Sequence, residues 1–449
     1  MKDGVNKEIR LKQKNPYFKS FKLLIILIKY FSLFSFFIVA EQNMRKLINL
    51  SSSEIHLVIR GSGNQSLLNN SFYLEPTEVY VNGIYRDSCK MYCELELEEN
   101  NVTLIFNSSI ISCERMFTSL DNIIEIDLSH FDFSSVTNMS FMFRDLTNLQ
   151  KINFGDINTS SVVDMKGLFF NCSKLQLLDL SNFDTSLVTI MESFFYNCTN
   201  LRSLDLSNFN TKNVKNMRLL FYNCSKLETI NLSNFDTSSV TTMEGLFYNC
   251  SNLPSIDISS FNTCKVENMR LLFYSCSKLE TINLSNFDTS SVTNMEAMFY
   301  FCTNLLSIDV SNFDTKNVEI LNFLFYICPK LTSIDISNFN TSKVTSMRYL
   351  FANCTNLKTI NLGEMNTSSV KDMRALFYYN ENLESIDLSS FDTSSVTLMG
   401  WMFFHCYKIK KIIIPETFNT SNVVSMYSMF SHCKSLISLN LSSFDTTKV

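Results

Sequence analysis

Cysteine, histidine, aspartate and serine are the side chains that could carry chemistry here, and their arrangement argues against catalysis. The 449 residues include 14 cysteines but only 4 histidines. His405 and His432 each precede a cysteine and could hold a metal together, although two surface residues are the simpler interpretation. Aspartate and serine abound, but no histidine accompanies them to form a triad. The motifs G-x-x-x-x-G-K, G-x-G-x-x-G, H-E-x-x-H and G-x-S-x-G are absent from the sequence. We expect no enzyme, no cofactor and no metal site.

Ten of the cysteines recur at one position of a repeated unit, which indicates a structural role. They are residues 172, 198, 224, 250, 276, 302, 328, 354, 406 and 433. Leu146 and Asn380 take this position in two other units, so we expect a buried, mostly apolar site where free thiols act as small hydrophobic groups. Bridges between neighbouring cysteines are the alternative. Cys89 and Cys93 lie outside the repeats and form the candidate disulfide, with Cys113 as a competing partner.

The unit is 26 residues long and is copied along most of the chain. Only 9 Gly and 5 Pro but 40 Phe are present, a skew typical of one copied module. Blocks open at Ile123, Leu149, Leu175, Leu201, Leu227, Leu253, Leu279, Leu305, Leu331, Leu357, Leu383 and Ile409. These are twelve full blocks; the last has 27 residues, a degenerate block precedes them, and an incomplete one follows at Leu436.

Each block, numbered from its first residue, joins a strand pattern to a helix pattern. Positions 1, 4 and 6 are apolar and give L-x-x-I-x-L, the strand signature of leucine-rich repeats. A Ser or Thr after position 9 is available to cap a helix. Positions 14, 17, 20 or 21, and 24 are apolar at helical spacing, as in Val240, Met243, Phe247 and Cys250. We therefore predict one strand and one short helix per block.

Stacked blocks should bury one another's apolar sides and place equal positions in ladders. Phenylalanines at positions 9 and 21 become two aromatic ladders in the core, with methionine at position 17 between them. Strands pack about 4.8 Å apart and helices about 8–10 Å apart. The prediction is thus an α/β solenoid: a curved leucine-rich repeat stack with a parallel β-sheet on its concave face and short helices on its convex face.

Position 18 alternates in charge between neighbouring blocks. It holds Glu192, Arg218, Glu244, Arg270 and Glu296. Opposite charges on adjacent coils can pair and set the register, at a few tenths of a kcal/mol to about 1 kcal/mol each. We interpret this ladder as packing order rather than function.

The chain divides into four regions by composition. Residues 1–22 are rich in Lys and Arg, and 23–40 are apolar apart from Lys29. This order is typical of a signal peptide, with an uncleaved signal-anchor helix as the alternative, so membrane contact through 23–40 is expected in the second case. Residues 42–110 alternate as short strands and should form a small β cap. Residues 111–449 form the solenoid.

The candidate binding face consists of strand positions 3, 5 and 7, which point away from the core. Position 3 is mostly Ser or Thr, position 5 is Asp or Asn, and position 7 is Ser. The named candidates are Ser203, Asp205, Ser207, Thr229, Asn231, Ser233, Ser255, Asp257, Ser259, Asp309, Ser311 and Asp335. Such a uniform polar face favours an extended partner over a single pocket. A merely solvated sheet face is the alternative interpretation.

The blocks that carry LxxIDLSNFDTSSVTNMxxLFYNC resemble the BspA-like leucine-rich repeats of bacterial and protist surface proteins. The resemblance covers residues 111–449 and implies a solenoid displayed at the cell surface for adhesion. It assigns no catalytic residue. Sequons such as those at Asn101, Asn171 and Asn231 imply glycosylation only in a eukaryotic secretory route.

These observations together favour a non-enzymatic protein of the secretory pathway, anchored at the cell surface or secreted. We expect an extracellular protein or glycan ligand. The net charge of −5 offers no basic surface to nucleic acid. A passive surface coat and a membrane-anchored receptor ectodomain are the alternatives.

Overall fold

The computed structural model describes residues 52–449, and Glu54–Val449 form one compact unit. The predicted basic segment 1–22 and the apolar run 23–40 lie outside the described residues. Within 52–449, none of the chain forms a helix that is both long and apolar enough to cross a membrane.

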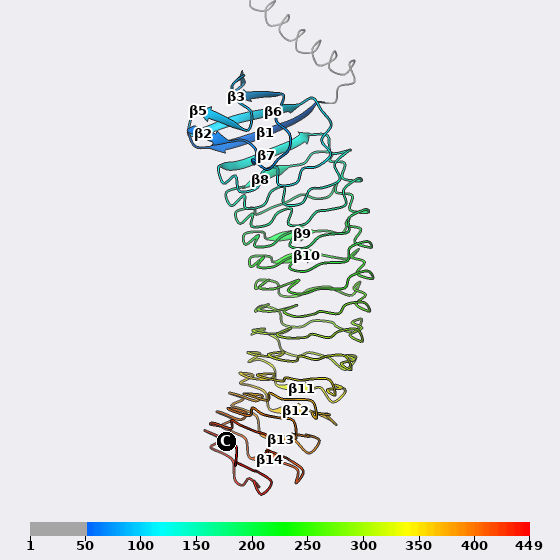
Figure 1. The fold of residues 1–449 in the computed structure, drawn as a ribbon, viewed down its shortest axis with the longest axis vertical. Helices are drawn as coiled ribbons and strands as arrows, with labels where there is room; N and C mark the ends of the chain where they lie inside the picture. The colour runs from blue at the N-terminus through cyan, green and yellow to red at the C-terminus, as the bar shows by residue number, and fades with distance from the viewer. Residues whose placement is uncertain (1–51) are drawn as a thin grey trace, which may run out of the picture. The chain divides into compact units, whose positions relative to one another are not determined.

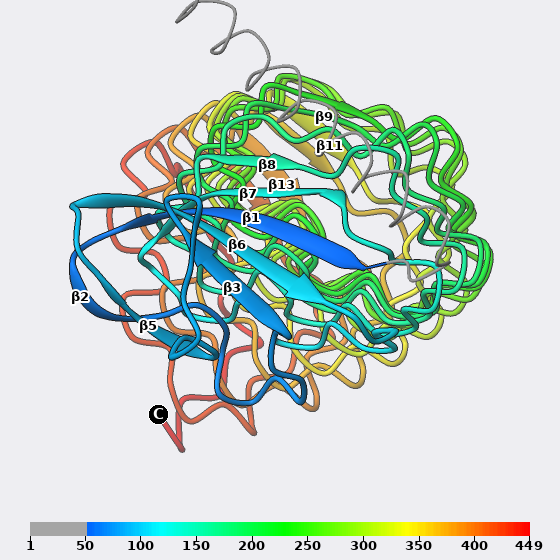
Figure 2. The ribbon, with the colours of Figure 1, turned by 90° about the horizontal axis from the view of Figure 1, so that it is seen from above.

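The repeated blocks form successive coils of a parallel β-solenoid (Figure 1). One parallel bridge per coil, at block position 16, links each coil to the next from Ser112 to Ser425. Short parallel strands pair at block positions 3 to 5, and the coils overlie one another when viewed from above (Figure 2). They are β9 (Ser203–Asp205) with β10 (Thr229–Asn231), β11 (Ser333–Asp335) with β12 (Thr359–Asn361), and β13 (Ser385–Asp387) with β14 (Lys411–Ile413). The predicted stacking of equal modules over parallel strands is confirmed.

Antiparallel strands precede the coils and pair directly with the first of them. They are β1 (Ser53–Arg60), β2 (Gly63–Ser66), β3 (Glu78–Val81), β4 (Ile84–Tyr85), β5 (Tyr92–Leu95) and β6 (Glu99–Phe106). One sheet has the order β4-β3-β6-β1-β7-β8, where β7 is Ile123–His130 and β8 is Lys151–Asn153. Because β1 runs antiparallel to β7, and β7 parallel to β8, this sheet covers the first apolar edge of the solenoid.

The predicted short helices are wrong: residues 52–449 contain none, and consecutive tight turns take their place. Leu219 and Asn223 have φ angles of 56° and 58°, a left-handed conformation that interrupts a helix. Tyr222 N–H donates to Leu219 O within the coil (3.3 Å), whereas Leu219 N–H donates to Glu244 O in the next coil (2.9 Å). A helix would need all of these N–H groups within its own coil, so the cross-coil bonds exclude it.

Because the predicted helices are absent from residues 52–449, the reason for expecting a curved stack no longer applies. The prediction rested on helices that need a wider spacing than strands. Here backbone hydrogen bonds join neighbouring coils at the turns as well as at the strands, so both sides share the spacing of paired strands. The fold is a β-solenoid rather than an α/β stack.

The interior contains the predicted aromatic ladder together with buried polar donors. The rings of Phe221 and Phe247 stack with centroids 5.5 Å apart. The thiol of Cys250 donates to the carbonyl oxygen of Phe221 at 3.2 Å. In another coil, Asn380 Nδ2 donates to the equivalent carbonyl of Phe351 at 2.9 Å. Cysteine and asparagine can therefore share this position because both supply a buried donor.

Candidate functional site

The twelve candidate residues lie on one surface of the solenoid, which we call the strand wall (block positions 3, 5 and 7). All are exposed except Ser207, which is half-buried. In β9 the order is exposed, buried, exposed, as expected for a strand with one face in the core. The structure thus lines these side chains up along the stack rather than bringing them together around one point.

The aspartates of the strand wall also close a turn after each strand. Ser207 N–H donates to Asp205 Oδ1 at 3.0 Å, and Ser311 N–H donates to Asp309 Oδ1 at 2.9 Å. The bond from the Ser207 backbone holds the pKa of Asp205 below its ordinary value. One carboxylate oxygen of each of these residues is therefore already used by the chain itself.

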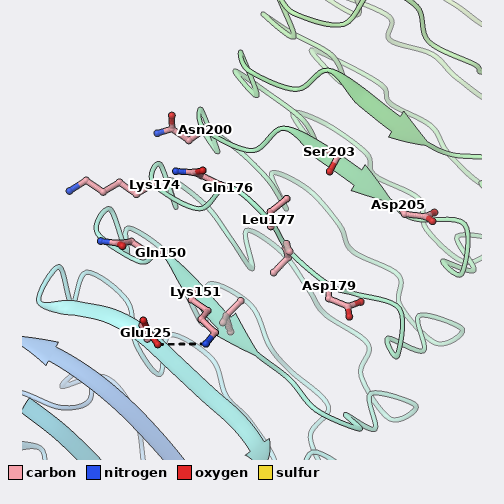
Figure 3. A pocket seen from close by; sticks show the side chains of 12 residues that line it. Glu125, Gln150, Lys151, Lys174, Gln176, Leu177, Asp179, Asn200, Ser203 and Asp205 are labelled. Carbon is pink, nitrogen blue, oxygen red and sulfur yellow. Dashed lines mark ion pairs between the residues drawn. The ribbon is translucent and has the colours of Figure 1, made fainter.

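The strand wall is hollowed near its N-terminal end by a depression of about 1040 Å³. Leu177 lies at its centre and is 70% exposed (Figure 3). The lining comprises Glu125, Gln150, Lys151, Ile152, Lys174, Gln176, Leu177, Leu178, Asp179, Asn200, Ser203 and Asp205. Of the candidates named from the sequence, only Ser203 and Asp205 belong to it.

Charge is distributed unevenly around this depression. Lys174 and the amides of Gln150 and Gln176 lie on one side of Leu177, and the carboxylates of Asp179 and Asp205 lie on the other (Figure 3). The arrangement supplies donors, acceptors and an apolar centre for a ligand. Sequence reasoning missed this site, although a signal was present: block position 3, elsewhere mostly Ser or Thr, holds Leu177 here.

A second hollow of about 380 Å³ adjoins the first and shares Glu125 and Lys151 with it. Lys151 Nζ lies 4.0 Å from Glu125 Oε2, a weak exposed ion pair. Residues of the N-terminal sheet line the rest, including His56, whose Nδ1 lies 3.0 Å from Thr103 Oγ1. The antiparallel strands therefore extend the candidate surface as well as covering the edge of the solenoid.

Another surface, the turn wall, is formed by block positions 18 to 23. The predicted charge ladder is confirmed here: Arg218 bridges Glu192 (3.3 Å) and Glu244 (3.0 Å). Arg270 extends the ladder to Glu296 (2.8 Å). Because each arginine contacts carboxylates of two coils, this ladder fixes the register between neighbouring coils.

A tyrosine ladder beside these charges was not predicted. Successive half-buried rings at block position 22 stack with centroids 4.2 to 4.7 Å apart. They are Tyr196, Tyr222, Tyr248, Tyr274, Tyr300 and Tyr326. Burial, and then the neighbouring hydroxyl of Tyr248, raise the pKa of Tyr222, so this ring stays neutral at physiological pH.

The repeats match a protein family, described as "Mycoplasma protein of unknown function, DUF285". The matches cover residues 111–229, 200–307, 280–385 and 354–449. The chain belongs to this family. Among solved structures, a leucine-rich repeat protein from Eubacterium ventriosum ATCC 27560 is similar at 22% identity, over 74% of this chain and 77% of that chain, with a TM-score of 0.35. No curated protein matches this DUF285 chain.

The cysteines of this DUF285 chain are placed for packing rather than for reaction. Cys89 and Cys93 form a disulfide. The repeat cysteines are free, and burial raises the pKa of Cys198 to about 12. An inert thiol is the result, because the thiolate is the reactive form. His405 and His432 do meet, with ring centroids 4.2 Å apart, but residues 52–449 hold no group of three or more potential metal ligands.

Asparagines of the DUF285 repeats that begin sequons also take part in a ladder. Asn249 Nδ2 donates to Asn223 Oδ1 in the preceding coil at 2.6 Å. Both residues have left-handed φ angles of 53° and 58° and are half-buried. A glycan on Asn249 would take one of the two hydrogen positions of the amide nitrogen that contacts Asn223, and the asparagine side chain already has a use in joining the coils.

Proposed function

We propose that this chain is a non-enzymatic binding protein, displayed at the cell surface or secreted, that contacts an extracellular protein or glycan through the strand wall. The depression around Leu177 is the observation that carries the proposal. There an exposed apolar side chain, amides and charges of both signs surround one hollow.

We expect the binding free energy to come from one apolar contact at Leu177 and from many weak contacts along the strand wall. Covering a leucine side chain contributes about 1.5–3 kcal/mol. The repeated hydroxyls and amides of the strand wall then add weak contacts along an extended partner, which raise the overall affinity through multivalency. The resemblance of the repeats to BspA-like surface proteins supports display outside the cell.

The depression is tested by removing its apolar centre while keeping the fold. Leu177→Ser gives the polar residue found at this position in other coils, and Asp205→Asn keeps the acceptor for Ser207 N–H. The matched control is Leu306→Ser, since Leu306 is also exposed (48%) but lies outside the depression. We expect the purified full-length chain to bind members of a matrix-protein and glycan array, and Leu177→Ser to weaken that binding about tenfold.

The alternative function is a passive surface coat. It is favoured by the aspartates of the strand wall, which already bond the following backbone N–H groups and so have a purely structural use. A coat predicts no bound array component and no difference among the three variants. Binding that Leu177→Ser and Leu306→Ser weaken equally would reject the depression as the contact site.

A further inference from the structure

The alternation of charges at block position 18 ends after Glu296. Beyond that point one arginine, Arg348, has no carboxylate partner within residues 52–449. The next coils hold Asn322, Arg348 and Arg374 at block position 18. Arg374 finds a partner within its own coil, since its Nη2 lies 2.6 Å from Asp372 Oδ2. Among the described residues, no carboxylate forms an ion pair with Arg348, in contrast to Arg218 and Arg270.

Arg348 is instead held by its backbone and by an aromatic ring. Its N–H donates to Asn322 Oδ1 at 3.0 Å, and its guanidinium carbon lies 4.9 Å from the ring centroid of Phe323. Its Nε is buried and has no hydrogen-bond partner among residues 52–449. The terminal nitrogens of this guanidinium likewise form no hydrogen bond or ion pair with the described residues, so they are available to an oxyanion.

The ring beneath this guanidinium, Phe323, belongs to a cluster of aromatic side chains. Tyr349 stacks on Phe323 with centroids 5.2 Å apart, and Tyr326 meets both rings edge-on. Further along, Tyr427 is 45% exposed and packs against Trp401, the single tryptophan of the chain, at 4.3 Å. Tyrosine, tryptophan and arginine are the residues enriched in the energetically important parts of interfaces.

We propose that Arg348 and the rings around it form a binding site for a carboxylate or sulfate group carried by a polysaccharide. The terminal nitrogens of the guanidinium receive the anion, because the planar donor geometry of arginine matches such oxyanions. The uncovered parts of the half-buried rings of Phe323, Tyr326 and Tyr349 pack against the apolar faces of the sugar, and the tyrosine hydroxyls bond its hydroxyl groups. This site lies on the turn wall and does not depend on the function proposed for the strand wall.

The first test variant gives Arg348 a carboxylate partner within the protein. Asn322→Glu places a carboxylate one coil before Arg348, as Glu244 lies one coil before Arg270, so it should pair with Arg348 and compete with any ligand. Arg348→Gln removes the cation directly. The control is Arg202→Gln, because Arg202 also carries a guanidinium but makes only an exposed ion pair with Glu228 (3.2 Å) on another surface.

Binding is measured by calorimetry on the full-length chain with defined probes. These are heparin, which carries sulfate and carboxylate, hyaluronan, which carries carboxylate alone, neutral dextran, and poly-glutamate as an acidic peptide. We expect one of the two anionic polysaccharides to bind, Arg348→Gln and Asn322→Glu each to weaken it at least tenfold, and Arg202→Gln to leave it unchanged. Preference for heparin assigns sulfate, and equal binding of hyaluronan assigns carboxylate.

Several results would overturn the proposal. They are failure of both anionic polysaccharides to bind, equal binding of dextran, tighter binding of poly-glutamate, or full binding by Asn322→Glu. If Arg348→Gln does not fold, Asn322→Glu decides alone, since it keeps the guanidinium; circular dichroism checks that this variant is folded, because its new carboxylate gains Arg348 but also lies one coil from Glu296. Loss of binding in Leu177→Ser with normal binding in Asn322→Glu would place the polysaccharide on the strand wall instead.

Discussion

Thr237 shows at the scale of one residue how neighbouring coils are held together. Its side chain is fully buried, and its Oγ1 donates to the carbonyl oxygen of Asn262 at 2.8 Å. The same hydroxyl accepts the N–H of Asn262, also at 2.8 Å. One hydroxyl thus satisfies both backbone groups of a residue in the next coil, so a threonine recurs at this block position.

Replacing Thr237 by valine keeps the shape but removes both bonds. We expect Thr237→Val to lower the free energy of unfolding by about 1–3 kcal/mol, because two backbone groups of Asn262 lose their partner in a buried place. Thr237→Ser should recover most of the loss. The control is Thr241→Val, since Thr241 is exposed and water can replace its bond to Lys215 O (3.3 Å). Denaturant unfolding measures the difference, and equal losses in the two valine variants would contradict it.

This role of threonine could not be predicted from the pattern of one block. A Thr after Asp or Asn commonly caps a helix, so the pattern of one block predicts a cap within its own coil. The partner of Thr237 lies one coil further on, a separation that only the stacked structure reveals. The alternation of exposed and buried residues in β9 was predictable, because a strand has a period of two.

At the scale of the element, the turns after the strands depend on how closely neighbouring coils approach. Gly363 has a φ of 59°, and a Cβ built there would lie 2.6 Å from both the Cα and the carbonyl oxygen of Ser337. Neither backbone atom can move independently of its coil. Gly83 has a φ of 79°, but a Cβ there would meet no atom within 4 Å. Comparing substitutions at Gly363 and Gly83 therefore separates the cost of backbone strain from the cost of crowding.

We expect Gly363→Ala to destabilise the protein by about 2–4 kcal/mol, from left-handed strain plus overpacking against the adjacent coil. Gly83→Ala should cost about 1 kcal/mol, from strain alone. Thermal unfolding monitored by circular dichroism compares the two. A loss for Gly363→Ala no larger than that for Gly83→Ala would show that the coils can separate at this turn.

The second half of each block shows why the elements were only partly predictable. Apolar residues three or four apart indicate a helix when a chain is considered alone. Consecutive tight turns give nearly the same spacing, and the choice between the two depends on whether N–H groups such as that of Leu219 bond within the coil or to the next one. The depression around Leu177 was missed for a related reason, since the predicted site followed what the blocks share and not where one block departs.

At the scale of the whole molecule, the alternating charges decide which coils can be deleted. Deleting two neighbouring coils keeps opposite charges together, whereas deleting one brings like charges together. Arg218 and Arg270 each lie between glutamates whose side chains are only 16% to 24% exposed. Like charges brought together at such partly covered positions repel more strongly than at a fully exposed surface. Blocks two apart carry the same charge, so the alternation survives only deletions of an even number of blocks.

Two deletions test this dependence directly. Removing residues 253–278 takes out the coil of Arg270 and places Glu244 beside Glu296, whereas removing 227–278 takes out two coils and places Arg218 beside Glu296. We expect the single-coil deletion to be less stable than the two-coil deletion by about 1–2 kcal/mol, although it keeps more buried surface. Raising the salt concentration should narrow the difference, because salt screens the repulsion. If the longer solenoid is the more stable one at low salt, buried surface rather than charge order governs which coils can be joined.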